Sequence, residues 1–408
     1  MMDFWRTRFA NLRRINIIFY LIGFIVLSAV IWNISEKIKD ELSVCKDEYY
    51  LPGLVPVNKA MSSAGFDKVS EYSWRYSDKN LNIDIVYDYN NCICYKNKYY
   101  FKLDNFIVID GEVYLSKEIL EKILTSTISY IDDTITVTLN DYSDSDWAAC
   151  PVITHAGGAV READAIWYYT NSKDALIQNY SLGCRLFEFD MYPTSDNNLA
   201  IVHDWTQFGN LDGTYFSTEE WLDFKTGTSN ATGGTYETMT IGTLLDEMLI
   251  NPDIFVITDT KSSEFPQEVV KSQFEIIYKE AVVRDPKLLN RIIPQIYNEE
   301  MYNVVQSIYE FPNLIFTCYA TTEPGNEIVE FCIHHKEFKA ITAPYAKQRL
   351  TDEDKQNLHQ NGLKLYYHSI YTYEEMVESF KNGADGIYTG ILTPDDVRNY
   401  LYTVNKNQ

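Results

Sequence analysis

Short apolar runs recur through the last two thirds of the chain, and most of them are separated by stretches with helical character. These stretches are roughly 10–35 residues long, which is the spacing of parallel strands joined by helices. Eight such units close into a barrel in about 260 residues, so the pattern predicts an α/β fold, a TIM-type (β/α)8 barrel over residues 146–408. The apolar runs are Pro151–Thr154, Cys184–Asp190, Ala200–Val202, Ile254–Ile257, Arg291–Ile296, Leu314–Cys318, Lys339–Thr342, Lys364–Tyr367 and Gly386–Tyr388.

These runs number nine, one more than an eight-stranded barrel needs. The surplus run follows Asp190 so closely that no helical crossover fits between Asp190 and Ala200. Residues 193–198 carry turn-forming side chains, so we expect the two runs to form a hairpin. The second strand of this hairpin ends at His203, which places an imidazole beside the first strand.

The strand 184–190 carries two carboxylates on one face. Because side chains alternate along a strand, Glu188 and Asp190 point to one side while Phe187 and Phe189 pack on the other. Strand carboxylates usually face solvent, and that is the alternative here. In a strand buried on both faces, however, carboxylates are unfavourable unless they are paired or bind a cation. We therefore favour metal ligation for this pair.

Further polar side chains follow other strands at the same end of the predicted barrel. Active sites of (β/α)8 barrels lie at the C-terminal ends of the strands, so these groups are expected to meet there. Three carboxylates suit Ca²⁺ or Mg²⁺ better than Zn²⁺, and two histidines can take and give a proton. The predicted cluster consists of His155, Glu188, Asp190, His203, Asp259, Lys261 and His368.

Two members of the cluster have features that suit a phosphate group. Gly157 and Gly158 follow His155 and leave room for a phosphate to approach the backbone; a loop histidine that caps a turn is the alternative. Lys261 lies two residues beyond Asp259 on the same strand face, and we expect it to contact a phosphate oxygen. An ordinary solvated lysine is its alternative.

Residues 51–145 read as a small α+β domain. Short strands that alternate aromatic and polar side chains are followed by a helix opened by Ser116, and then by a hairpin around residues 132–133. The predicted strands are Asn82–Tyr87, Tyr99–Leu103, Phe106–Ile109, Glu112–Leu115, Ile128–Ile131 and Thr134–Leu139, and the helix is Lys117–Leu124.

The N-terminus has the pattern of a membrane anchor. Residues 15–33 carry no charge and are close to the ~20 residues needed to cross a bilayer core. Four arginines lie in residues 1–14, so the positive-inside rule predicts a cytoplasmic tail, a single transmembrane helix at 15–33, a stalk at 34–50 and an extracytoplasmic remainder at the cell membrane. A cleaved signal peptide is the alternative, but residues 31–32 are bulky where such peptides end in small residues.

The net charge and the cysteine spacing argue against two kinds of function, nucleic-acid binding and a zinc site in the first third of the chain. The formal net charge is −23, and residues 15–408 hold 31 basic against 57 acidic side chains. So acidic a body argues against nucleic-acid binding. Seven cysteines occur without CxxC spacing, and no histidine precedes His155, so a zinc site in the first third is not expected. Cys184 and Cys318 lie inside apolar runs and read as buried hydrophobic residues.

The barrel region resembles the glycerophosphodiester phosphodiesterase family. The resemblance spans roughly Val152 to Asp396 and is carried by six pieces in the family's order. It implies that His155 and His203 are the acid–base pair, that Glu188, Asp190 and Asp259 hold a divalent metal, and that Asn171, His368, Lys261 and the glycines border the phosphate. The pieces are 153–158 (ITHAGG), 171–175 (NSKDA), 188–190 (EFD), His203-Asp204, 259–261 (DTK) and 383–389 (GADGIYT).

Four positions depart from the family pattern. Ala156 stands where the family has arginine, which removes a bidentate phosphate contact. Asp259 replaces the usual glutamate, His368 stands where tryptophan is frequent, and Gly390 where aspartate is frequent. Three explanations of these departures are open. Another cation, such as Lys261 or the metal, neutralises the phosphate; the enzyme acts on a different substrate; or the site binds its ligand without catalysis. Both histidines and all three carboxylates remain, so we expect activity to survive.

Residues 99–140 resemble the copper amine oxidase N-terminal-like domain, through IDGEVYLSKEILEKIL and TITVTLN. The resemblance implies a surface-facing accessory module. It implies no copper site, because imidazole ligands are absent from this segment. A small α+β spacer is the simpler interpretation and the one we favour.

The sequence thus predicts a membrane-anchored ectoenzyme that hydrolyses a small-molecule or lipid phosphodiester with a polyol such as glycerol. A lipase of the phosphoinositide- or sphingolipid-cleaving type is one alternative, for which exposed aromatic loops after His203 would be needed. A non-catalytic surface module that binds a phosphorylated polymer is the other.

Overall fold

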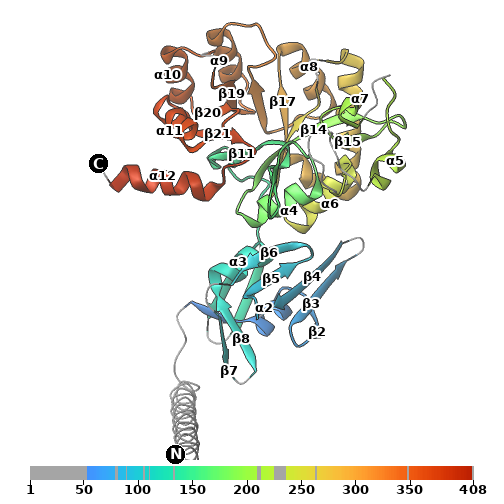
Figure 1. The fold of residues 1–408 in the computed structure, drawn as a ribbon, viewed down its shortest axis with the longest axis vertical. Coiled ribbons are helices and arrows are strands. Elements are labelled where there is room, and N and C mark those ends of the chain that lie inside the picture. Colours follow the sequence, from blue (N-terminus) through green and yellow to red (C-terminus); the bar gives the residue numbers. More distant parts are fainter. Residues whose placement is uncertain are drawn as a thin grey trace, which may run out of the picture.

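The computed structural model describes residues 53–406, apart from 79–80, 89, 104–105, 110, 132–133, 209–212, 225–235, 262–263 and 347–348. The predicted tail, transmembrane helix and stalk lie outside the described residues. None of the described helices is both long and apolar enough to cross a bilayer. The described chain forms a small α+β domain and a larger barrel, each with its own apolar core (Figure 1).

The small domain combines a five-stranded antiparallel sheet, a three-stranded sheet and a hairpin around two helices. In α3 the side chain of Ser116 accepts a hydrogen bond from the amide of Ile119, as an N-cap residue should. The elements are β1 (Leu54–Pro56), α2 (Val57–Ser63), β2 (Asp67–Ser70), β3 (Ser73–Asp78), β4 (Leu81–Asp88), β5 (Ile93–Lys96), β6 (Tyr99–Lys102), β7 (Phe106–Ile109), β8 (Glu112–Ser116), α3 (Lys117–Leu124), β9 (Ser126–Ile131) and β10 (Thr134–Leu139).

Eight parallel strands close the barrel, because the first barrel strand, β11, pairs both with the second, β14, and with the last, β21. The predicted eightfold barrel is therefore present. A short 3-10 turn at Trp147–Ala149 precedes it, and the Tyr366 hydroxyl donates to the carbonyls of Ala148 and Cys150. The barrel strands are β11 (Val152–Thr154), β14 (Leu186–Pro193), β16 (Phe255–Asp259), β17 (Ile292–Ile296), β18 (Leu314–Thr317), β19 (Phe338–Pro344), β20 (Lys364–His368) and β21 (Gly386–Thr389).

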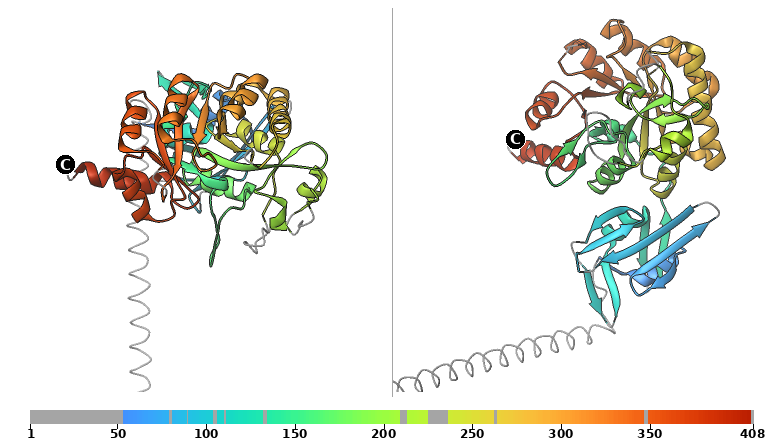
Figure 2. Two further views of the ribbon diagram at one scale, coloured as in Figure 1. Left: turned by 90° about the horizontal axis from the view of Figure 1, so that it is seen from above. Right: turned by 45° about the vertical axis from the view of Figure 1, so that its right-hand side comes forward.

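Helices surround this barrel, and the last one projects from it toward the C-terminus (Figures 1 and 2). A small hairpin of β12 (Val160–Arg161) and β13 (Ile166–Trp167) follows β11. The helices are α4 (Lys173–Ser181), α5 (Thr218–Asp223), α6 (Ile241–Ile250), α7 (Gln267–Arg284), α8 (Glu299–Ile308), α9 (Gly325–His334), α10 (Asp352–Gln360), α11 (Tyr373–Lys381) and α12 (Pro394–Lys406).

The surplus apolar run, Ala200–Val202, forms the hairpin that its spacing from Asp190 predicts. β15 (Leu199–Ile201) pairs antiparallel with the end of β14, with Met191 opposite Ile201. The aromatic residues after His203 pack mainly on one another: Trp205 and Trp221 are each 2% exposed, and their rings lie 5.3 Å apart. They stabilise the described part of this insertion, in which Tyr215 is 38% exposed.

Alternation along β14 separates two environments. Leu186 faces the barrel interior, in a cluster with Ile153 and Ile257. Phe187 and Phe189 face outward, into the core between the strands and the helices. Glu188 and Asp190 share the face of Leu186, so the same period of two that fills the barrel with apolar side chains also turns these carboxylates inward.

Candidate active site

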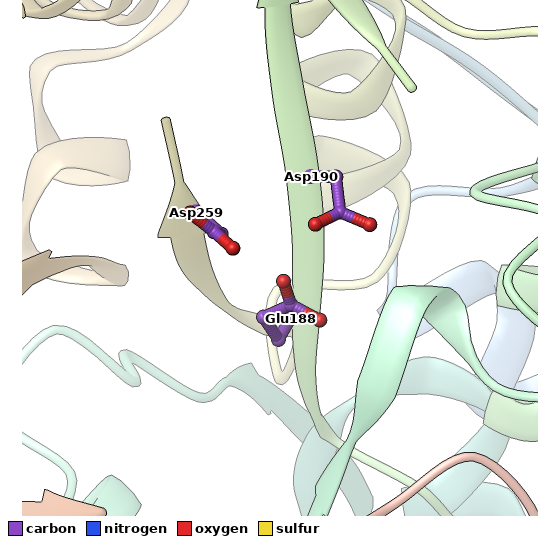
Figure 3. A group of neighbouring side chains, drawn as sticks. All are labelled: Glu188, Asp190 and Asp259. Atoms are coloured by element: carbon purple, nitrogen blue, oxygen red, sulfur yellow. The ribbon is translucent and has the colours of Figure 1, made fainter. Parts of the chain in front are cut away.

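Three carboxylates meet where β14 and β16 lie side by side (Figure 3). Asp190 is directly opposite Asp259 in the parallel register, and Glu188 lies one inward position earlier on β14. Each of the three offers an oxygen within 4.8 Å of the others, and none is more than 4% exposed. The pairing of β14 with β16 thus brings Asp259 to Asp190, although the two residues are 69 positions apart in the chain.

The ammonium of Lys261 lies between two of these carboxylates. Its Nζ is 2.5 Å from Asp190 Oδ1 and 2.7 Å from Asp259 Oδ2. Burial by itself lowers the pKa of a lysine, but Asp190 and Asp259 outweigh it and raise the pKa of Lys261 well above its ordinary value. Lys261 is therefore a permanent cation of the site and also lines the cavity described below.

Two tyrosines from the next strands hold Asp259. The hydroxyl of Tyr297 donates to Asp259 Oδ1, and the hydroxyl of Tyr319 lies 3.2 Å from Asp259 Oδ2. The two hydroxyls are 2.8 Å apart. This network fixes the orientation of the Asp259 carboxylate and occupies part of its hydrogen-bonding capacity.

The cluster carries more negative than positive charge. Burial, and then Asp190 and Asp259, raise the pKa of Glu188 well above its ordinary value, although the amide of Ala156 donates to its Oε2 at 2.8 Å. Three carboxylates facing one ammonium leave an excess that a divalent cation would neutralise. The donors are all carboxylate oxygens, which are the ligands that Ca²⁺ and Mg²⁺ prefer. The residues present therefore fit a hard divalent metal ion.

His155 lies above the carboxylates, at the end of β11. Its Nε2 is 3.8 Å from Glu188 Oε2, and its ring packs edge-on against Tyr169 and Tyr388. Burial lowers the pKa of His155 to about 4, although Asp190 acts in the opposite direction. The imidazole is consequently neutral at pH 7 and able to accept a proton.

His203 is paired with the next residue in the chain. Its Nδ1 is 2.6 Å from Asp204 Oδ2, and Asp204 also accepts a hydrogen bond from the amide of Thr206. The carboxylate favours a proton on Nδ1, which leaves Nε2 for a substrate. With 41% of its side chain exposed, His203 reaches the cavity from the side of the β14–β15 hairpin.

Asn171 positions a metal ligand. Its Nδ2 donates to Asp190 Oδ2 at 2.8 Å, and its Oδ1 accepts from the amide of Asp190 at 3.1 Å. The side chain is 2% exposed and does not line the cavity. The structure thus places it behind the Asp190 carboxylate, and its contact with a phosphate stays a prediction.

Gly157 and Gly158 likewise lie away from the cavity lining. Both have positive φ, and a Cβ would meet Phe189 at 2.6 Å in the first and Asn179 at 2.4 Å in the second. The space beside them is filled by protein side chains. Packing by itself therefore requires glycine at both positions, and their contact with a phosphate stays a prediction.

A cavity of about 850 Å³ opens over the cluster. His368, at the end of β20, lines it as predicted, with its ring centroid 5.7 Å from that of Tyr319. The β12–β13 hairpin and the segment after it add an aromatic rim, in which Tyr168 and Tyr169 are each 37% exposed. The polar lining consists of His155, Glu188, His203, Gln207, Asp259, Lys261, Gln295, Thr317, Tyr319, Thr342, His368 and Tyr388.

Sequence reasoning missed Asp204 as the partner of His203 and missed Tyr297 and Tyr319 altogether. Tyr297 directly follows β17, and Tyr319 is the second residue after β18. They come two positions after Gln295 and Thr317, which also line the cavity. The alternation rule that found Glu188 would have pointed to them. Their hydrogen bonds to Asp259 depend on strand order and could not be read from spacing.

No family model matches the chain, and no curated protein matches its sequence. Solved structures that match include a glycerophosphodiester phosphodiesterase from Parabacteroides distasonis, at 17% identity and a TM-score of 0.48 over 62% of this chain and 98% of that one.

Two further matches have similar extents. A glycerophosphodiester phosphodiesterase from Thermotoga maritima is 11% identical, with a TM-score of 0.42 over 62% of this chain and 97% of that one. A phosphodiesterase from Oleispira antarctica, solved with the product sn-glycerol-3-phosphate, is 13% identical, with a TM-score of 0.44 over 61% and 96%. At this identity, the activity of the present chain has to be argued from its own side chains.

Proposed function

We propose that this protein is a metal-dependent phosphodiesterase that hydrolyses a glycerophosphodiester-like substrate. One observation carries the proposal: one oxygen from each of three buried carboxylates lies within 4.8 Å of the others at the mouth of the barrel, next to a cavity whose lining includes two histidines and a lysine. Phosphodiester cleavage needs positive charge at the non-bridging oxygens, one proton acceptor and one proton donor. This constellation supplies all three.

The two histidines have different environments and therefore different tasks. His155 is neutral at pH 7, so it removes the proton from the attacking group, either a substrate hydroxyl or water. The Asp204 carboxylate holds Nδ1 of His203 and so orients the ring with Nε2 toward the substrate, where it protonates the leaving alkoxide. The attacking oxygen forms a bond to phosphorus while the bond from phosphorus to the leaving oxygen breaks.

Glu188, Asp190 and Asp259 would hold a Ca²⁺ or Mg²⁺ ion. When bound, this ion supplies positive charge beside the phosphoryl oxygens. Asn171 holds Asp190 in place, and Tyr297 and Tyr319 do the same for Asp259. Among the described residues of the lining, Lys261 is the only lysine or arginine, and it is placed to neutralise part of the phosphate charge that an arginine at position 156 would neutralise.

A panel of diesters tests this function. Purified full-length chain is assayed with glycerophosphocholine, with a lysophospholipid and with a sphingolipid in mixed micelles, after EDTA treatment and after addition of Ca²⁺ or Mg²⁺. We expect turnover of the water-soluble diester that disappears with EDTA and returns with metal. Preference for the lipid would instead support a lipase, and the rim residues Tyr168 and Tyr169 would then be its contact surface.

The non-catalytic alternative has a specific basis. Lys261 already bridges Asp190 and Asp259, and Ala156 offers no phosphate contact. If the chain binds glycerol 3-phosphate by calorimetry but turns over no diester with either metal, the site is a binding module and the enzymatic proposal fails.

We also propose that residues 15–33 anchor the chain in the cell membrane with the barrel outside the cytoplasm. The uncharged stretch and the preceding arginines support this. Full-length protein should resist extraction from membranes at alkaline pH and should be degraded by protease added to intact cells. Release of the chain by alkaline extraction would contradict the anchor.

A further inference from the structure

The two domains enclose a second cavity, of about 450 Å³, at the opposite end of the barrel from the carboxylates. Its walls come from the small domain and from the loops that precede β16 and β17. We call it the junction cavity and define it by Phe66, Lys96, Thr125, Leu249 and Arg291. Nothing in the proposed reaction uses it.

Two cations are buried in the lining of the junction cavity. Lys96 is 2% exposed and Arg291 is 6% exposed. The Lys96 ammonium makes a single long hydrogen bond, 3.5 Å to Thr125 Oγ1, and Arg291 donates only to backbone carbonyls. Within the described part of the chain, neither forms an ion pair. Buried charges are normally paired, so both are short of a negative partner.

The consequence of burial is visible in both groups. Loss of hydration lowers the pKa of Lys96 to about 8 and that of Arg291 to about 10. Asp253 opposes the shift in both cases but is itself occupied: it pairs with Arg185 at 2.5 Å and accepts a hydrogen bond from Tyr180. Asp253 therefore offsets the positive charge of Lys96 and Arg291 only at a distance, without a contact to either.

The carboxylates in the cavity lining have partners of their own. Asp141 pairs with Lys287 at 2.7 Å, and Asp285 accepts from the amide of Lys287. The described lining holds three cations, Lys96, Lys287 and Arg291, against two carboxylates, which act on Arg291 through space. The cavity therefore has a net positive lining in a chain whose formal charge is −23. Most of the remaining lining is apolar or aromatic, including Phe66, Tyr76, Leu81, Ile83, Leu249 and Ile250.

From this combination we propose that the junction cavity binds a small anionic amphiphile, a single anionic group on a short apolar chain. The anionic group pairs with the buried cations, and the apolar chain lies against the side chains of both domains. A free carboxylate and a phosphate headgroup share this chemistry. The proposal is independent of the phosphodiesterase function, because it concerns different residues at the other end of the barrel.

Calorimetry on the full-length chain in a nonionic detergent tests the proposal with hexanoate, hexyl phosphate and hexanol. We expect saturable 1:1 binding of at least one anion and raised thermal stability, with hexanol at least about tenfold weaker because it lacks the charge. Binding of hexanoate alone identifies a carboxylate site, and binding of hexyl phosphate alone identifies a phosphate site.

Two variants make the test specific. Lys96→Met keeps the length of the side chain but removes its charge, and should weaken anion binding at least about tenfold. Leu249→Trp leaves both cations and fills the space, and should abolish binding; it decides the matter if Lys96→Met fails to fold. Lys271→Met, exposed on α7, is the matched control and should bind like wild type.

Three results would overturn the proposal. The first is no saturable binding of either anion at millimolar concentration, which would mean that the cavity holds water only. The second is equal affinity for hexanol, which would make it a general apolar pocket. The third is unchanged anion binding in both Lys96→Met and Leu249→Trp, which would place the bound anion elsewhere.

Discussion

The mouth of the barrel and its base both bury ionisable side chains, but with opposite sign. At the mouth, Glu188, Asp190 and Asp259 face a single ammonium, that of Lys261. At the base, the buried cations of the junction cavity have no carboxylate in contact with them in the described structure. We therefore propose opposite ligand preferences for the two ends of the barrel, a divalent cation at the mouth and an anion at the base.

The two sites also differ in how they are built. The carboxylates come from adjacent strands of one sheet, and hydrogen bonds from Asn171 and Tyr297 hold them in place. The cations come from two domains, and their position depends on how the small domain packs on the barrel, through contacts such as the hydrogen bond from Tyr99 to Glu247. Rigid support favours catalysis, whereas a site shared by two domains favours binding that links them.

The largest effect on catalysis at the mouth of the barrel is expected for His155. His155→Ala should reduce kcat of diester hydrolysis by about a thousandfold, because the neutral base at the mouth is lost. Substrate binding should change much less. His334→Ala, on the exposed face of α9, is the control and should retain full activity. A drop of less than tenfold in His155→Ala would assign the base to another residue.

Removing a carboxylate should act through the metal. Glu188→Gln keeps the shape of the side chain but weakens metal affinity by about a hundredfold, so activity should recover only at high Ca²⁺ or Mg²⁺. Metal titrations of wild type and variant measure this. Glu310→Gln, at an exposed position, serves as the control. Equal metal dependence of Glu188→Gln and wild type would show that the three carboxylates are not the metal site.

At the base, the buried cation should make folding stability depend on pH. Because the pKa of Lys96 falls from an ordinary 10.5 to about 8 on folding, the unfolded chain binds more protons between these values. The contribution of Lys96 to the free energy of unfolding therefore rises by about 2 kcal/mol between pH 8 and pH 10.5.

Urea unfolding at both pH values measures this effect as the difference between wild type and Lys96→Met, in which other titrating groups cancel. The variant should be the more stable of the two at pH 8, and the gap should close toward pH 10.5. A gap that stays constant with pH would show that Lys96 is not buried as a charged group.

The smallest expected effect concerns the support of Asp259. Tyr297→Phe removes one hydrogen bond and should lower metal affinity by about threefold to tenfold, with kcat at saturating metal nearly unchanged. Tyr302→Phe removes a tyrosine hydroxyl of α8 that bonds to Glu337, away from the cavity, and should leave metal affinity unaltered. An equal effect of both variants would indicate a general loss of stability.

Much of the mouth could be predicted from the sequence. The apolar runs predicted the barrel, the short gap between Asp190 and Ala200 predicted the β14–β15 hairpin, and alternation predicted that Glu188 and Asp190 turn inward. These inferences depend only on the period of a strand and on the length of a connection. Both are local properties of the chain.

The roles of the neighbours could not be predicted in the same way. Asn171 holds Asp190, and a side chain at Gly157 or Gly158 would meet Phe189 or Asn179. The sequence contains no information on which side chain fills the space beside a glycine until the strands are placed. The membrane anchor and the resemblance of residues 99–140 to an accessory domain remain predictions.

By itself, then, the sequence determined which side chains the barrel turns inward at its mouth, because that follows from alternation and from the common direction of parallel strands. Only the tertiary structure decided that Lys261 lies between Asp190 and Asp259, that Tyr297 and Tyr319 hold Asp259, and that Lys96 and Arg291 line one cavity. These contacts depend on strand order and on the packing of two domains. Neither is encoded in the spacing of residues along the chain.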